Sequence, residues 1–262
     1  MRAPRGGRTA DGTPAPPRRG GDDALPAVVR RLTDTGPDRD QDLRTRLMLR
    51  LSALLAASAR HAGAAAVTTG RWLTDLVVDI APHIPVRDLE TLRRHHDGLA
   101  GDQLADALIE RAAHVTAGVG AALGVIATTE WSLPAALLSA PVQIAAETVA
   151  VVAVELKLVA ELHEVYGRTP PGTPGVRAAA YLSSWSRRRG IDPIATSGLM
   201  GEVVSSAAKR QLRTRIIRRT GSSSATLLPF FAGAIAGATL NSKNTKRLGR
   251  LVAADLARRN RP

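Results

Sequence analysis

The stretch AETVAVVAVELKLVAELHEVYG (residues 146–167) decides the fold class of this chain. It belongs to a long apolar segment that begins at Pro141 and reaches Tyr166, where Gly167 supplies a helix stop signal. Charged side chains interrupt the apolar residues, among them Glu147, Glu155, Lys157 and Glu161. Charges at these positions argue against a helix that is surrounded by lipid, so we expect a long helix packed against protein.

The composition of the whole chain favours helices as well. Hydrophobic residues make up 44% of the 262 residues but aromatic residues only 3%, so Ala, Leu and Val must build the core. No strand-like alternation is found. We therefore predict an all-α protein, a compact multi-helix bundle with a disordered N-terminal tail. Besides 141–166, apolar spacing and stop signals predict helices at about 40–61, 72–80, 89–98, 102–129, 178–188, 194–219, 228–240 and 245–259.

The N-terminal residues 1–40 have a different composition from the rest. They are rich in Pro, Gly, Arg and Asp and show no sustained apolar period, so we predict a disordered tail followed by a helical domain at 41–262. The first arginines precede no apolar run of the kind found in secretory signals, which predicts a cytoplasmic location. The absence of cysteine excludes disulfides, thiolate metal sites and cysteine catalysis.

Three stretches of low polarity, 115–129, 131–146 and 220–242, are candidates for membrane insertion. A spanning helix needs about 20 mainly apolar residues, and only the third reaches that length, by including a Gly/Ser-rich loop. Glycines four residues apart are expected to let helices pack closely, either in a protein core or in lipid. These helix-packing glycines are Gly120, Gly124, Gly233 and Gly237. We expect a bundle that docks on a bilayer or partly inserts into it.

The net charge of +13 is concentrated at the C-terminal end. Residues 187–262 contain 16 of the 36 basic residues and 3 of the 23 acidic residues, and they enclose the uncharged segment LLPFFAGAIAGATL (227–240). An apolar helix flanked by cations is typical of a segment that binds an anionic membrane surface. The predicted membrane-binding residues are Phe230, Phe231, Arg210, Arg213, Arg218, Arg219, Lys243, Lys246, Arg247 and Arg250.

Several features follow one another in order through residues 101–262. They are GDQLADALIERAAHVTAGVGAALG (101–124), a Pro-broken segment, LKLVAELHEVYG (156–167) and LLPFFAGAIAGATLNSKNTKRLGRLVA (227–253). This series resembles the EcsC family of bacterial proteins, named after the third gene of an operon that encodes an ABC transporter. The most specific parts are the YG helix end and a C-terminal pattern matched by Pro229, Gly233, Ala234, Gly237, Ala238, Asn241, Thr245 and Gly249. The resemblance implies a helical, membrane-associated protein that is linked to transport and secretion and has no established catalytic activity.

Glu147 and Glu155 are the most unusual polar residues, because they lie two turns apart on an apolar helix. A buried carboxylate needs a partner or takes up a proton. The two residues therefore either line a polar site that holds a ligand or substrate, or pair with arginines from neighbouring helices. We favour pairing.

Metal and enzyme motifs are weak in this sequence. Glu110 with His114, and Asp79 with His83, stand four residues apart and would share a helix face, but neither pair repeats a spacing typical of metal ligands. No phosphate-binding loop, dinucleotide fingerprint, nucleophile elbow or zinc-protease helix is found. We expect no metal, no cofactor and no enzymatic activity.

Two functions are consistent with these observations. The favoured prediction is a non-enzymatic helical protein on the cytoplasmic face of the membrane, EcsC-like and accessory to transport or secretion, with anionic lipid and a transporter or other protein as partners. The alternative is a soluble basic helical protein that binds nucleic acid or a protein through its C-terminal region. Against nucleic acid, the basic stretches lack a helix-turn-helix pattern and contain Trp185 as their only base-stacking aromatic residue.

Overall fold

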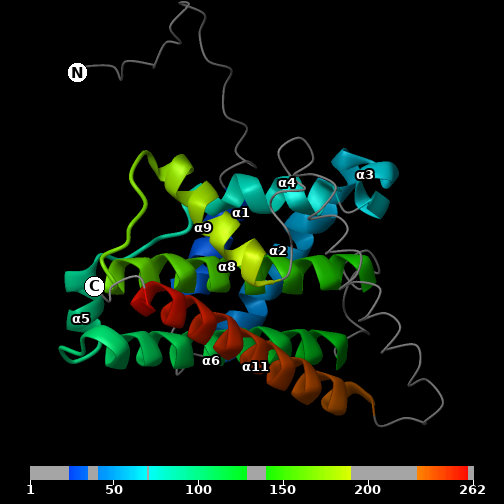
Figure 1. Cartoon of the computed structure of the whole chain (residues 1–262). Coiled ribbons are helices and arrows are strands. Elements are labelled where there is room, and N and C mark those ends of the chain that lie inside the picture. The colour runs from blue at the N-terminus through cyan, green and yellow to red at the C-terminus, as the bar shows by residue number, and fades with distance from the viewer. Residues whose placement is uncertain (1–23, 35–40, 70, 129–139, 190–228, 259–262) are drawn as a thin grey trace, which may run out of the picture.

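The computed structural model describes residues 24–34, 41–69, 71–128, 140–189 and 229–258 (Figure 1). Within these ranges the chain is helical and contains no strand, which confirms the prediction of an all-α bundle. The elements are α1 (Ala24–Asp34), α2 (Gln41–Ala62), α3 (Ala64–Thr69), α4 (Arg71–Ile80), the 3₁₀ turn η1 (Ala81–His83), α5 (Leu89–His95), α6 (Gly101–Thr128), α8 (Ala140–Val165), α9 (Pro174–Arg188) and α11 (Pro229–Arg258).

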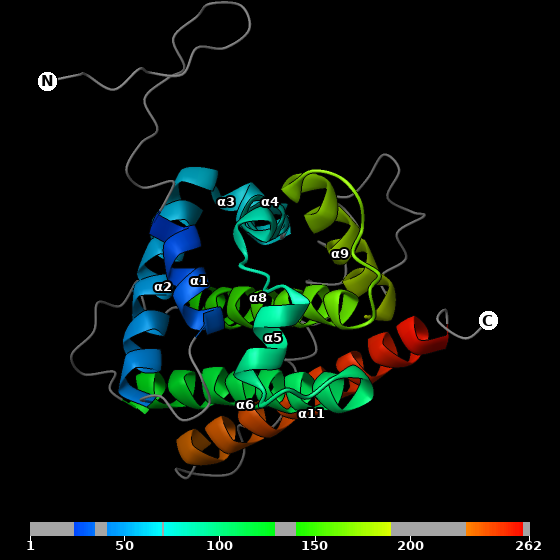
Figure 2. The same cartoon turned by 90° about the vertical axis from the view of Figure 1, so that its left-hand side faces the viewer.

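Helix α8 is the centre of the bundle. It contacts α1, α2, α4, α5, α6, α9 and α11, and nearly every residue from Val149 to Leu162 is buried. In both views α4 and α9 lie above α8, while α6 and α11 lie below it (Figures 1 and 2). A helix that is apolar all round can be stable in water only when other helices surround it, which is the position that residues 146–167 occupy.

The C-terminal end of α8 is set by the Tyr166–Gly167 pair. Gly167 adopts a φ of 61°, which a residue with a Cβ rarely adopts. Its N–H donates to the Glu164 carbonyl at 3.1 Å, and the Arg168 N–H donates to the His163 carbonyl at 2.8 Å. These two bonds form a Schellman motif, so the chain leaves the helix at the predicted stop signal.

Helix α11 packs most extensively on α6. The close approach is made possible by Gly249, where a Cβ would lie 2.6 Å from Cγ1 of Ile109. Further along the same contact, Lys246 Nζ lies 2.6 Å from Glu110 Oε2. Gly249 is not one of the four glycines that the spacing pointed to, and close packing at those four stays a prediction.

The structure departs from the predictions most at α1 and α11. Helix α1 lies within the segment predicted to be disordered, because Leu25, Val28, Val29 and Leu32 form an apolar stripe that is buried against the core. Helix α11 runs without interruption through 241–244, where the sequence predicted a break between two helices. Asn and Ser favour helix ends when they are solvated, but Asn241 is 2% exposed and donates to Glu147, so a tertiary contact holds it inside the helix.

Candidate functional site

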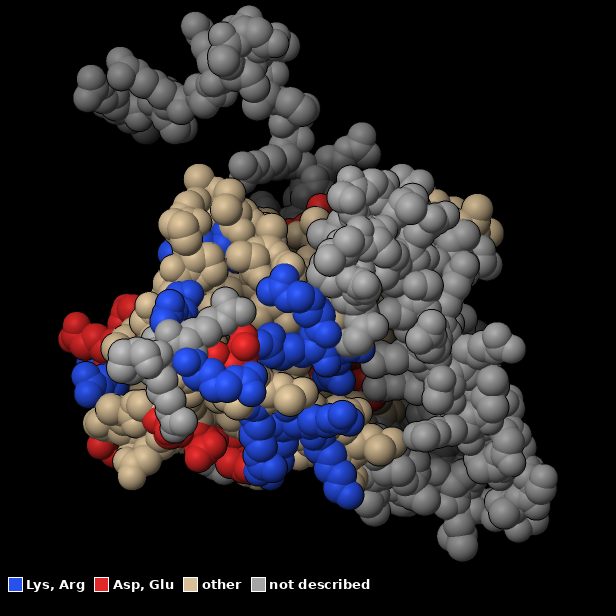
Figure 3. All heavy atoms as spheres, viewed as in Figure 1, with Lys and Arg blue, Asp and Glu red and all other residues tan. Residues whose placement is uncertain are grey.

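The outer face of α11 combines cations with exposed leucines. Leu240 is 47% exposed and Leu251 is 46% exposed. Lys243, Arg247 and Arg250 are exposed as well, and at 100° per residue they fall on the side of the helix that carries both leucines. We call Leu240, Lys243, Arg247, Arg250 and Leu251 the α11 outer face. Figure 3 shows Lys and Arg side chains gathered over the front of the molecule, where α11 and α9 lie in Figure 1.

The outer face is held in position by the opposite side of the same helix. Asn241, Thr245 and Gly249 follow one another at four-residue spacing and are all buried. Asn241 Nδ2 donates to Glu147 Oε1 at 2.9 Å, and Thr245 Oγ1 donates to Glu155 Oε1 at 2.9 Å. Each contact fixes the rotation of α11 about its axis, so the outer face points away from the bundle.

Glu155 is completely buried and has a partner on each carboxylate oxygen. Oε2 accepts from Nε1 of Trp185 at 2.9 Å, while Oε1 accepts from Thr245 and from the Arg189 guanidinium. One cation, the Arg189 guanidinium, and two neutral donors thus stabilise negative charge on this carboxylate. The Glu155 cluster therefore joins α8 to α9 and α11, and its role is to hold three helices together.

Two threonine hydroxyls extend the Glu155 cluster toward α6. Thr245 has a single hydroxyl hydrogen, which it donates to the Glu155 carboxylate. A hydrogen bond across the 3.1 Å contact between the two hydroxyls is then donated by Thr116. Thr116 also lies 3.1 Å from the Ala113 carbonyl, so its one hydroxyl hydrogen is shared between these two acceptors. The chain of hydrogen bonds thus runs from α6 through α11 to α8.

A second cluster of charged side chains, of which Lys157 and Glu161 are buried, lies on the opposite side of α8. Lys157 Nζ donates to the Pro85 carbonyl at 2.6 Å and lies 3.1 Å from Glu161 Oε1 and 3.4 Å from Asp34 Oδ1. Arg87 completes the group at 3.1 Å from Asp34 and 3.7 Å from Glu161. Two cations thus face two carboxylates, and they join α8 to the end of α1 and to the segment before α5. The charges on α8 that argued against lipid are therefore matched by protein partners.

Several predicted residues lie where the structure gives no side-chain description. Phe230, Phe231, Gly233 and Gly237 fall within α11, and Gly124 falls within α6, but their side-chain surroundings are outside the described part. Gly120 is buried in α6. Outside the described residues altogether lie Arg210, Arg213, Arg218 and Arg219. Lys246 is part of the ion pair with Glu110 and is less available than its neighbours Lys243, Arg247 and Arg250.

The acid–histidine pairs do not assemble into a site. Glu110 is engaged by Lys246, and His83 Nδ1 lies 3.0 Å from the carbonyl of Asp79 rather than from its carboxylate. Among the described residues, no group of three or more side chains has the composition and proximity of a metal site. Over the same residues, every helix is either too short or too polar to cross a bilayer.

Sequence reasoning singled out Glu155 and favoured pairing with an arginine of a neighbouring helix, which Arg189 at the end of α9 provides, but it did not identify the individual partners. Trp185, Arg189 and Thr245 follow Glu155 by 30, 34 and 90 positions, so no local spacing connects them. One signal was present: Thr245 and Asn241 interrupt an otherwise apolar helical stripe, and a buried carboxylate requires donors.

Comparison with known proteins returns no relative. No family model, no curated protein and no solved structure matches this chain.

Proposed function

We propose that this chain is a non-enzymatic, membrane-associated helical protein that binds anionic lipid on the cytoplasmic face through the α11 outer face. The observation that carries the proposal is the exposure of Leu240 and Leu251 beside Lys243, Arg247 and Arg250 on one side of a helix whose other side is locked in the core. Anionic headgroups attract the cations, while the leucines enter the boundary between headgroups and acyl chains.

The magnitudes describe weak, reversible binding. Each cation near an anionic surface contributes about 1 kcal/mol, so the three exposed cations supply about 3 kcal/mol. Burying the exposed half of each leucine adds about 1 kcal/mol per side chain. The total of about 5 kcal/mol corresponds to a dissociation constant on the order of 0.1–1 mM. Residues 210–219 and the Phe230–Phe231 pair, which the sequence predicts to take part, would strengthen this binding.

Nucleic acid is the competing partner for the same cations. Exposed leucines gain nothing from a phosphate backbone, which favours lipid over a duplex for the α11 outer face. The resemblance of residues 101–262 to the EcsC family also supports membrane association. It further suggests a role accessory to transport or secretion, with a transporter or other protein as a second partner.

The test is flotation of the full chain with vesicles of phosphatidylcholine alone or with phosphatidylglycerol, at low and high salt. We expect flotation with the anionic vesicles only, and a reduction at high salt because salt screens the headgroup attraction. Changing Leu240 and Leu251 to Ser, or Lys243, Arg247 and Arg250 to Gln, should each weaken flotation at least fivefold. A matched control changes the exposed Arg93 and Arg94 of α5 to Gln, which should leave flotation unchanged.

Two outcomes would contradict the proposal. If the leucine variant floats like the unchanged chain while Phe230→Ser/Phe231→Ser does not, the apolar contact lies at the start of α11 instead. If no variant floats but the chain retards duplex DNA in a salt-sensitive way that the Lys243, Arg247 and Arg250 changes remove, the basic surface binds nucleic acid.

A further inference from the structure

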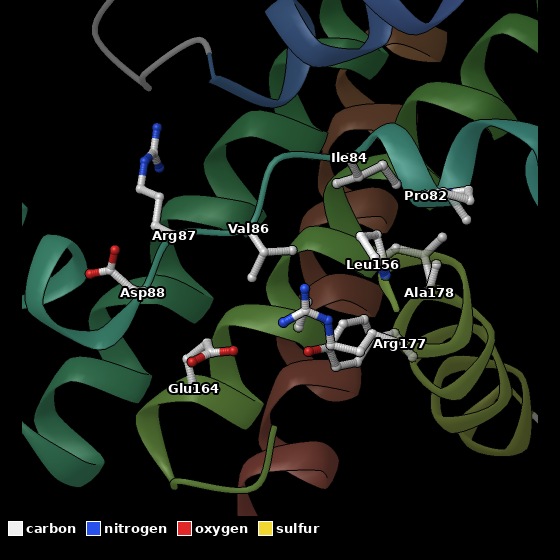
Figure 4. Close-up of a pocket in the computed structure, with 13 residues that line it drawn as sticks. Pro82, Ile84, Val86, Arg87, Asp88, Leu156, Glu164, Arg177 and Ala178 are labelled. Atoms are coloured by element: carbon white, nitrogen blue, oxygen red, sulfur yellow. The ribbon is translucent and has the colours of Figure 1, made fainter. Parts of the chain in front are cut away.

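A cavity of about 340 Å³ lies between α8, α9 and the segment 81–88, and no residue of the α11 outer face lines it (Figure 4). Ligand pockets in proteins begin at about 300 Å³, so this volume is that of a small-molecule site. Its apolar walls come from Leu156 and Ala160 of α8, from Ile84 and Val86, and from Ala178 of α9. Val86 is 38% exposed, so the apolar surface continues to the mouth of the cavity.

Four charged side chains line this cavity, and two of them, Arg177 and Glu164, carry opposite charges without forming a pair. Arg177 on α9 and Glu164 on α8 both line it, and both are half-buried. Figure 4 shows the Arg177 side chain extending from α9 across the cavity toward the side on which Glu164 lies. Within the described part of the chain, neither side chain makes an ion pair or a hydrogen bond. The other two, by contrast, are engaged: Arg87 lies in ion pairs with Asp34 and Glu161, and Asp88 accepts a backbone N–H as the N-cap of α5.

A third polar group, the Tyr181 hydroxyl, lines the same cavity. Tyr181 is 7% exposed, and among the described residues its hydroxyl has no hydrogen-bond partner. Burial and the charge of Glu164 raise the pKa of Tyr181, against the smaller opposing effect of Arg177, so the hydroxyl stays protonated and available as a donor. The His163 ring packs edge-on against the Tyr181 ring with centroids 5.3 Å apart, which limits the movement of the ring.

From this arrangement we infer that the cavity binds a small zwitterion with an apolar body, of the class of the aliphatic and aromatic α-amino acids. The ligand carboxylate accepts from the Arg177 guanidinium and the Tyr181 hydroxyl, the ligand ammonium donates to Glu164, and the apolar side chain packs on Leu156 and Val86. A ligand with a single charge would pair with one of Arg177 and Glu164 and would bury the other without a partner, which is costly.

The test uses the full chain and calorimetric titration with four probes, L-leucine, L-phenylalanine, N-acetyl-L-leucine and L-leucinamide. The last two keep the apolar body but each lacks one charge. We expect the amino acids to bind, and N-acetyl-L-leucine and L-leucinamide to bind at least tenfold more weakly than L-leucine.

Variants assign the contacts in the same experiment. Arg177→Gln and Glu164→Gln should each weaken the binding of L-leucine at least tenfold, and Tyr181→Phe should weaken it severalfold. Among the described residues, the side chains of Arg177 and Glu164 have no ion-pair or hydrogen-bond partner, so these variants are expected to fold, which circular dichroism checks. Arg168→Gln, an exposed arginine outside the cavity lining, is the control.

The inference fails if none of the four probes binds at millimolar concentration. It also fails if N-acetyl-L-leucine binds as tightly as L-leucine and Glu164→Gln has no effect, because the site would then select an anion rather than a zwitterion. Neither result bears on flotation with vesicles, which depends on a different surface.

Discussion

The indole nitrogen Nε1 of Trp185 lies 2.9 Å from Oε2 of Glu155, and this hydrogen bond ties α9 to the central helix of the bundle. Taking an isolated carboxylate out of water costs several kcal/mol, and the partners around Glu155 must offset that cost. Trp185 is the partner of Oε2, whereas Oε1 is shared by Arg189 and Thr245. Loss of the indole donor is therefore not compensated by the other two.

The first prediction concerns this donor. Trp185→Phe should lower the free energy of unfolding by about 1–3 kcal/mol, because it leaves a buried carboxylate oxygen without its donor. Trp72→Phe is the matched control, since Trp72 Nε1 donates at the same distance of 2.9 Å to the neutral, half-buried hydroxyl of Ser58. Its cost should be about 0.5–1.5 kcal/mol. Urea unfolding followed by circular dichroism measures the loss of stability in both variants. Equal losses would show that donation to a carboxylate makes the Trp185 hydrogen bond no stronger than the Trp72 bond to a hydroxyl.

The second prediction concerns the buried cation on the other side of α8. Lys157→Met should lower the free energy of unfolding by about 3–5 kcal/mol, because within the described ranges Glu161 then keeps only the 3.7 Å contact with Arg87. Adding Glu161→Leu removes the carboxylate that was left behind, while the Arg87–Asp34 pair remains. The double variant should therefore be more stable than Lys157→Met alone. Strictly additive losses in a double-mutant cycle would argue that the two side chains do not interact.

The sequence predicts the central helix well because its signals are local. The apolar run before Tyr166 and the stop at Gly167 are both read within a few residues, and the structure ends α8 there with a Schellman motif. The apolar stripe of Leu25, Val28, Val29 and Leu32 is an equally local signal. The prediction of a disordered segment there was wrong because it rested on the Pro-rich and Arg-rich residues that precede the stripe.

What the sequence could not predict depends on contacts between distant segments. The Asn and Ser residues of 241–244 favour a helix end, yet α11 continues through them because Asn241 donates to Glu147, which lies 94 positions earlier. The cavity beside α8 could not be predicted from the sequence either, because Glu164, Arg177 and Val86 come together only when α8, α9 and the segment before α5 pack. For the α11 outer face, the sequence predicts the cations Lys243, Arg247 and Arg250 but not the exposed leucines Leu240 and Leu251.

The third prediction tests the contact between α6 and α11. Gly249→Ala should lower the free energy of unfolding by about 1–3 kcal/mol, because the new methyl group would lie 2.6 Å from Cγ1 of Ile109. Gly175→Ala, in the first turn of α9, meets no atom within 4 Å and should raise the stability by about 0.4–1 kcal/mol. In the Ile109→Ala background, which removes Cγ1, Gly249→Ala should cost less than in the unchanged chain. If it costs the same, the clash is relieved elsewhere and Ile109 is not what requires glycine.

The fourth prediction concerns pH. Burial lowers the pKa of His96 below its usual 6.5, and the positive charges of Arg111, His95 and Arg87 act in the same direction, with Asp97 opposing them. The unfolded chain therefore binds a proton at His96 at a higher pH than the folded chain does, so this group contributes stability above pH 6.5 that is lost as the pH falls through the folded-state value. The unchanged chain should exceed His96→Gln in stability by a margin that shrinks between pH 7.5 and pH 5. Subtracting the variant cancels the carboxylates, which titrate in both proteins, and His61→Gln at the exposed end of α2 controls for the loss of an imidazole. A margin that stays constant across this range would mean that His96 takes up its proton equally in both states.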